Sequence, residues 1–158
     1  MTDNYIGIMI ESLRRKKDVL TDILKLSEEQ SLLLDDPNLE PDTFEKNVNR
    51  KAALIEKLEQ LDTGFESLYD KVKEELESNR DIHKEQIRQM QELIRALTEL
   101  NMQIQATEAI NKEKATAKFA YIRQQAKEIR SSQKIVKEYY NNMMHKAYNE
   151  PHFLDNKK

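Results

Sequence analysis

The side chains that most often bind metals or transfer protons are, in this sequence, three histidines and many carboxylates. The histidines are His83, His145 and His152. A di-iron helical bundle requires a glutamate three residues before a histidine, repeated on two helices, so that both ligands face inward. Here those positions hold arginine or asparagine, namely Arg80, Asn142 and Asn149. The motif is therefore missing, and no pair of histidines has the spacing of a metal site.

The sequence predicts no other catalytic or cofactor-binding site. The chain has two glycines and no cysteine, which excludes a glycine-rich phosphate loop, thiolate chemistry and disulfides. The carboxylates fall on helix faces that the pattern predicts to be exposed, so paired acid–base roles are unsupported. We therefore expect no enzyme activity, no cofactor and no metal.

The scarcity of helix breakers determines the fold class. Between Pro41 and Pro151 the chain contains one glycine, Gly64, and no proline, and it is rich in good helix formers. Hydrophobic residues make up 38% and aromatic residues 6%, which suits a thin bundle better than a thick core. We expect a single all-α domain over 1–158, an elongated antiparallel bundle of three long helices with an extended C-terminal helix.

Apolar periodicity and turn residues set the expected helix boundaries. The helices are expected over 3–34, 42–78 and 81–148, followed by a tail over 149–158. A short loop with two prolines, Asp35–Pro41, makes the first two helices antiparallel neighbours. Asp42, with Glu45 three positions later, resembles a capping box and predicts Asp42 as the N-cap of the second helix.

Polar residues interrupt the apolar faces of the first two helices. Ser27 is a gap in a seven-residue line of the first helix, and Lys51 and Asp62 fall on the apolar face of the second. One interpretation places Lys51 and Asp62 at the edge of that face with their charged groups in water. The alternative is a buried polar contact that fixes the register of the helices.

The third predicted helix carries two apolar stripes in different registers. The first ends at Ile104, the pattern lapses over 105–118, and a second stripe follows. A continuous helix would span about 100 Å, roughly twice the first helix, so the second stripe would lie beyond the bundle without a partner in its own chain. An uncovered apolar stripe marks an interaction surface. The alternative is a break near Asn111, with a fourth helix that folds back.

We call the candidate partner-binding residues of this second stripe the C-terminal stripe. They are Phe119, Ile122, Ala126, Ile129, Val136, Tyr139, Tyr140, Met143 and Met144. Methionine repacks easily against different partners, and tyrosine combines a large apolar area with a hydroxyl group. The ordinary alternative is that these side chains form part of the core.

Charge and hydropathy restrict the class of partner. The net charge is −3 and both signs are interspersed, so the basic surplus of a nucleic-acid-binding protein is missing. No run approaches the ~18 apolar residues of a membrane span, and we expect no membrane insertion. The start of the sequence lacks the basic region of a secretion signal, so we expect a cytoplasmic protein. Its partner would be another protein or a second copy in a homodimer.

One segment resembles a known family. Residues 51–62, KAALIEKLEQLD, are similar to the second helix of the FlgN family of flagellar export chaperones. The chain length, the helical hairpin and the long final helix with an apolar stripe are similar too. The step Gly64-Phe65 and the segment Tyr139-Tyr140-Asn141-Asn142-Met143 look like those of FlgN-like proteins from Gram-positive flagellates.

The resemblance implies a function. It implies a cytoplasmic chaperone that binds the C-terminal helical region of hook–filament junction proteins through its own C-terminal helix. The chaperone then delivers them to a gate component of the type III export apparatus. Two alternatives remain: a structural coiled-coil homodimer or tether, and a chaperone for another client such as the filament cap. The register shift between Ile104 and Ile122 argues against a dedicated coiled coil, which keeps one repeat.

Overall fold

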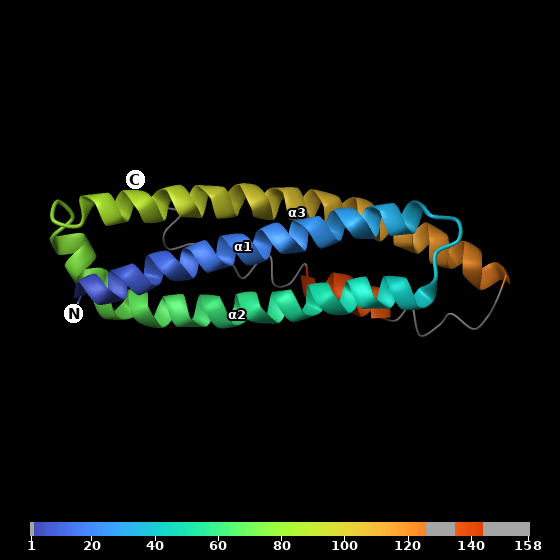
Figure 1. The fold of residues 1–158 in the computed structure, drawn as a ribbon, viewed down its shortest axis with the longest axis horizontal. Helices are drawn as coiled ribbons and strands as arrows, with labels where there is room; N and C mark the ends of the chain where they lie inside the picture. Colours follow the sequence, from blue (N-terminus) through green and yellow to red (C-terminus); the bar gives the residue numbers. More distant parts are fainter. Residues whose placement is uncertain (1, 126–134, 144–158) are drawn as a thin grey trace.

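The computed structural model describes residues 2–125 and 135–143, and within these ranges it contains helices and no strands. Helix α1 spans Thr2–Asp35, α2 spans Pro41–Ser78 and α3 spans Lys84–Gln125. Residues 135–143 form a further helical segment. The prediction of an all-α bundle of long antiparallel helices is confirmed (Figure 1).

Helix α1 lies between the other two long helices. It packs against α2 and against α3, whereas α2 and α3 make no comparable contact with each other. Figure 1 shows this arrangement, with the segment 135–143 beside α2 near the end where α2 begins. The three-helix bundle is thus held together by α1, and the segment 135–143 adds to it from outside.

Apolar side chains at helical spacing hold α1 in this central position. The buried ones on α1 are Ile6, Met9, Ile10, Leu13, Val19, Leu20, Ile23 and Leu34. Together with the buried polar residues Lys16, Ser27 and Gln30, this set recurs at the spacing expected for a helix with one broad buried face. No helix in the described part of the chain is long and apolar enough to cross a membrane.

The start of α2 differs from the predicted capping box. Glu40 is the N-cap residue, its side chain makes no capping hydrogen bond, and Pro41 occupies the first helical turn. Proline suits that position because its fixed φ is helical and its missing N–H would have no partner there. Asp42 therefore lies inside the first turn, where its charge still interacts favourably with the helix dipole.

Helix α3 and the segment 135–143 also differ from the expected single helix over 81–148. Helix α3 is continuous through 105–118, so there is no break near Asn111. A continuous helix would place Tyr140 roughly 48 Å beyond Glu108. Instead, Tyr140 and Glu108 both contact α1, within three residues of each other on that helix. Residues 135–143 therefore pack back onto the bundle and do not extend beyond it. The predicted tail over 149–158 lies outside the described residues.

Candidate functional site

A buried polar cluster lies where the segment 135–143 meets the three long helices. We define it as Ser27 and Gln30 from α1, Asn47 and Lys51 from α2, and Glu108 and Asn111 from α3. Lys51 is 0% exposed and Glu108 is 1% exposed. Charged side chains are almost never this buried unless they are paired, so each of these two needs a partner inside the fold.

The centre of the buried polar cluster is an ion pair between Lys51 and Glu108. The Lys51 ammonium group donates a hydrogen bond to Oε1 of Glu108. It also donates to Oε1 of Gln30 at 3.1 Å, and the Ser27 hydroxyl donates to Oε1 of Glu108 at 2.5 Å. Each long helix thus supplies at least one partner. Removal of either charge would leave the other buried and unpaired.

Two asparagines extend this network to the backbone of α1. Nδ2 of Asn111 donates to the carbonyl oxygen of Ser27 at 2.8 Å and to Oε1 of Gln30 at 3.1 Å. Nδ2 of Asn47 donates to the carbonyl oxygen of Leu26 at 2.9 Å. These bonds fix α2 and α3 at one register on α1, because a shift of either helix would break several of them together.

Two tyrosines from the segment 135–143 cover the buried polar cluster. The Lys51 ammonium nitrogen lies 4.5 Å from the centroid of the Tyr139 ring, which is a cation–π contact. The Tyr140 hydroxyl donates to Oε1 of Gln30 at 3.2 Å. The two rings also pack against each other, with centroids 5.3 Å apart. We call the surface beneath them, with Gln30, Lys51 and Glu108 at its centre, the covered face.

Burial changes the protonation equilibria at the covered face. It raises the pKa of Tyr139 and of Tyr140 well above the usual value, and the negative charge of Glu108 adds to both shifts. Burial lowers the pKa of Lys51 from 10.5 to about 8, although the charge and hydrogen bond of Glu108 oppose the shift. The tyrosines therefore stay neutral at physiological pH, while Lys51 titrates close to it.

The lowered pKa of Lys51 predicts that the protein becomes more stable as the pH rises from about 8 to 10. In this interval the unfolded chain keeps the Lys51 proton that the folded chain has lost, so the free energy of unfolding increases with pH. From the two pKa values the increase due to Lys51 is about 2 kcal/mol. Urea denaturation at pH 7.5 and 10 would measure it as the difference between the wild type and a variant without Lys51, because ionisation of Tyr139 and Tyr140 in the unfolded chain opposes the rise near pH 10 in both proteins. The double variant Lys51→Met, Glu108→Leu lacks the ion pair, and an equal rise in this variant would contradict the assignment.

Some polar atoms beneath the tyrosines have no hydrogen-bond partner among the described residues. They are Nε2 of Gln30, Oδ1 of Asn47, Oε2 of Glu108, Oδ1 of Asn111 and the Tyr139 hydroxyl. A buried polar atom without a partner costs about 1–3 kcal/mol relative to one that water can reach. The segment 135–143 therefore satisfies the apolar part of the covered face but leaves some of its polar atoms without hydrogen bonds.

The structure buries five of the six described members of the C-terminal stripe inside the fold. The buried ones are Phe119, Val136, Tyr139, Tyr140 and Met143, and Ile122 is partly buried. The expectation that this stripe lacks a partner in its own chain therefore differs from the structure. Ala126, Ile129 and Met144 lie outside the described residues.

Phe119 and Ile122 line a pocket at the end of the bundle where α2 begins. The other lining residues are Leu39, Pro41, Phe44, Glu45 and Ile135. The rings of Phe44 and Phe119 pack edge to face with centroids 5.5 Å apart. Ile135, at the start of the segment 135–143, thus lies close to the α1–α2 loop. The start of the segment can therefore be cross-linked to this loop.

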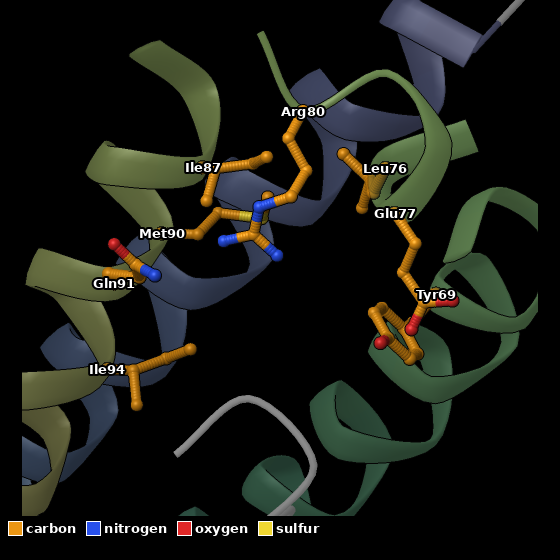
Figure 2. A pocket seen from close by; sticks show the side chains of 8 residues that line it. All are labelled: Tyr69, Leu76, Glu77, Arg80, Ile87, Met90, Gln91 and Ile94. Carbon is orange, nitrogen blue, oxygen red and sulfur yellow. The ribbon is translucent and has the colours of Figure 1, made fainter. Parts of the chain in front are cut away.

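A second, mostly apolar pocket lies at the opposite end, between the last turns of α2 and the first turns of α3. Figure 2 shows its lining side chains: Tyr69, Leu76 and Glu77 from α2, Arg80 from the turn, and Ile87, Met90, Gln91 and Ile94 from α3. Met90 belongs to the buried core. No group of side chains in the described ranges could hold a metal ion.

The sequence pattern does not reveal the buried polar cluster, although each helix carries a signal. Ser27 is a gap in an apolar line, Lys51 interrupts another, and Glu108 lies in the stretch where the pattern lapses. For Lys51 the interpretation of a buried contact is correct. Asp62 instead pairs with Lys16 of α1, at 2.8 Å between Oδ1 and Nζ, and keeps 24% of its side chain exposed.

Comparison with protein families identifies the family of this chain. The sequence model of the FlgN protein family matches residues 1–143, which is most of the chain. Comparison with curated proteins and with solved structures gives no match. The FlgN family is a family of chaperones and not of enzymes. The chain therefore belongs to the FlgN family of flagellar export chaperones.

Proposed function

We propose that this protein is a cytoplasmic chaperone for hook–filament junction proteins, whose C-terminal helical region it binds and which it delivers to the type III export apparatus. Membership of the FlgN family supports the general role in flagellar export. Family membership does not specify the client, the delivery step or the location, and these three are our proposal. The absence of an apolar span from the described helices is compatible with them.

The observation that carries this proposal is the amphipathic segment 135–143. Its buried residues, Val136, Tyr139, Tyr140 and Met143, follow the spacing i, i+3, i+4, i+7 of a helix that binds along one face. Helices α2 and α3 are already held by α1, so the segment can leave without dismantling the bundle. A C-terminal helix of this kind suits a chaperone that must contact an exposed client helix.

The proposed partner-binding surface is the C-terminal stripe. Its members on the segment 135–143 face the bundle, so a client contacts them only after the segment has moved away from the covered face. The polar atoms without partners beneath Tyr139 and Tyr140 favour such a movement, because water can then reach them. The affinity of the client must exceed the free energy that this opening costs.

Binding of purified junction proteins to the full chain tests the proposal. Titration followed by calorimetry should detect a complex with the wild-type chain. The variant Val136→Asp should bind about 100-fold more weakly, because it places a charge on an apolar contact surface. The matched variant Asn142→Asp adds the same charge at an exposed position of the same segment and should keep its affinity within about twofold.

Circular dichroism should show that Val136→Asp keeps the helical content of α1, α2 and α3. Equal affinity of the two variants would contradict a role for the stripe. If the wild-type chain binds the filament-cap protein and not the junction proteins, the client is different. A tight homodimer that binds neither would support the structural coiled coil.

A further inference from the structure

The covered face has the features of a binding surface that the protein's own segment fills incompletely. The segment 135–143 reaches it through Tyr140, which bonds to Gln30 of α1, and Tyr139, which lies over Lys51 of α2. Glu108 of α3 completes the centre of the face. All three long helices therefore contribute side chains to one surface, and a helix lying on it contacts all of them.

The chemistry of the covered face is that of a partly satisfied polar centre within an apolar surround. Oε2 of Glu108 and Oδ1 of Asn111 are acceptors without donors among the described residues, and Nε2 of Gln30 is a donor without an acceptor. These side chains are 1% exposed or less. The Tyr139 hydroxyl, which comes from the segment, lies near the Glu108 carboxylate but makes no hydrogen bond of good geometry to it.

A side-chain amide would complement this centre better than the phenol groups do. An asparagine or glutamine offers two N–H donors and one carbonyl acceptor on a single planar group. The donors match the free oxygens of Glu108 and Asn111, and the acceptor matches the free N–H of Gln30. A lysine or arginine on the partner would instead bury a further charge beside Lys51, which is unfavourable.

We propose that the client helix enters between the segment 135–143 and the bundle and docks on the covered face. The client is an amphipathic helix with an asparagine or glutamine over the ion pair of Lys51 and Glu108 and apolar residues one turn to either side. The freed residues Val136, Tyr139, Tyr140 and Met143 then cover the other side of the client. This inference rests on the proposed function and adds where the client lies and what its central residue is.

A reversible cross-link tests whether the segment must move. The chain contains no cysteine, so a single engineered pair reacts cleanly. Leu39 and Ile135 line the same pocket, and the two thiols of the double variant Leu39→Cys, Ile135→Cys can be joined by a short bifunctional thiol reagent that contains a reducible disulfide. The cross-linked protein should lose affinity for a junction protein at least tenfold, and reduction of the cross-linker should restore it.

Removal of the ion pair tests whether the client touches the covered face. The variant Lys51→Met, Glu108→Leu should bind the junction protein about tenfold more weakly, because its central amide loses polar partners. The matched control is Lys16→Met, Asp62→Leu, which removes a second ion pair between α1 and α2 away from the segment 135–143. The control should bind like the wild type.

The outcomes separate this inference from the proposed function. If the wild type binds the junction protein and the cross-linked form binds equally well, the segment need not move and the inference is wrong. The same follows if the two ion-pair variants have equal affinities. In both cases the proposed function stands. If the wild-type chain binds no junction protein, the proposed function and this inference are both overturned.

Discussion

Replacement of Glu108 with leucine is expected to lower the free energy of unfolding by about 3–5 kcal/mol, because it leaves the Lys51 ammonium group buried without a counter-charge. The Ser27 hydroxyl loses its acceptor in the same variant. For a chain of this length the loss corresponds to a decrease in Tm of roughly 6–20 °C. Urea denaturation followed by far-ultraviolet circular dichroism would measure it.

The double variant Lys51→Met, Glu108→Leu removes both charges. It therefore separates the effect of losing the ion pair from the effect of leaving one charge buried without a partner. Apolar side chains of similar length remove both desolvation penalties, which favours the double variant by about 1–4 kcal/mol. The loss of partners for Ser27 and Gln30 acts in the opposite direction by about 1–3 kcal/mol. We therefore expect its stability to lie within about 2 kcal/mol of the wild-type value, well above that of Glu108→Leu.

The single replacement is the critical measurement. A cost below about 1 kcal/mol for Glu108→Leu is typical of a solvent-exposed pair. That result would mean that water reaches Lys51 in solution and that the segment 135–143 does not cover it. The prediction thus tests the packing of the segment as well as the energy of the pair.

The general fold follows from the sequence because helix breakers are so rare. With one glycine between Pro41 and Pro151, long helices are the only regular elements available, and the loop before Pro41 sets their antiparallel order. Such patterns depend on local chemistry alone. The position of Glu40 as N-cap was not foreseen, because the preference of proline for the first turn prevails over the capping box of Asp42.

The buried polar cluster could not be predicted, because it depends on the alignment of three helices. Periodicity assigns burial to apolar residues, whereas on α3 the buried face runs through Ile104, Glu108, Asn111, Ala115 and Phe119. The buried positions keep their helical spacing over 105–118, where the apolar pattern lapses. Only the residue types at these positions change, from apolar to polar or small. The polar residues of each helix look like interruptions until the helices are placed side by side.

The return of the segment 135–143 has the same cause. Because a polar stretch separates two apolar stripes in the sequence, the pattern predicts the second stripe beyond the bundle. Besides its buried apolar side chains, the segment contacts the covered face through Gln30 and Lys51, and hydropathy alone does not predict that an aromatic stripe packs on either residue. Tyrosine can bind such a surface because it joins an apolar ring to a hydrogen-bonding group.

Phe119 provides the second large effect, because the structure places this member of the C-terminal stripe in the core. Its ring packs edge to face on Phe44, and both side chains are buried. Phe119→Ala is therefore expected to lower the free energy of unfolding by about 3–5 kcal/mol, through lost apolar burial and the cavity that remains. Denaturant unfolding would measure the loss. Tyr121→Ala is the control on the same helix, since Tyr121 is 63% exposed, and it should change stability by about 0.5 kcal/mol at most.

A double-mutant cycle with Phe44→Ala distinguishes core packing from a role in client binding. The double variant should lose about 0.5–1.5 kcal/mol less than the sum of the two single losses, because each single replacement already removes the contact between the rings. The affinity of Phe119→Ala for the client should then fall only to the extent that the variant loosens this end of the bundle. If Phe119→Ala is nearly as stable as the wild type and yet loses the client, Phe119 is exposed in solution. The partner-binding surface would then extend along α3 from the segment 135–143, with Phe119 at its far end.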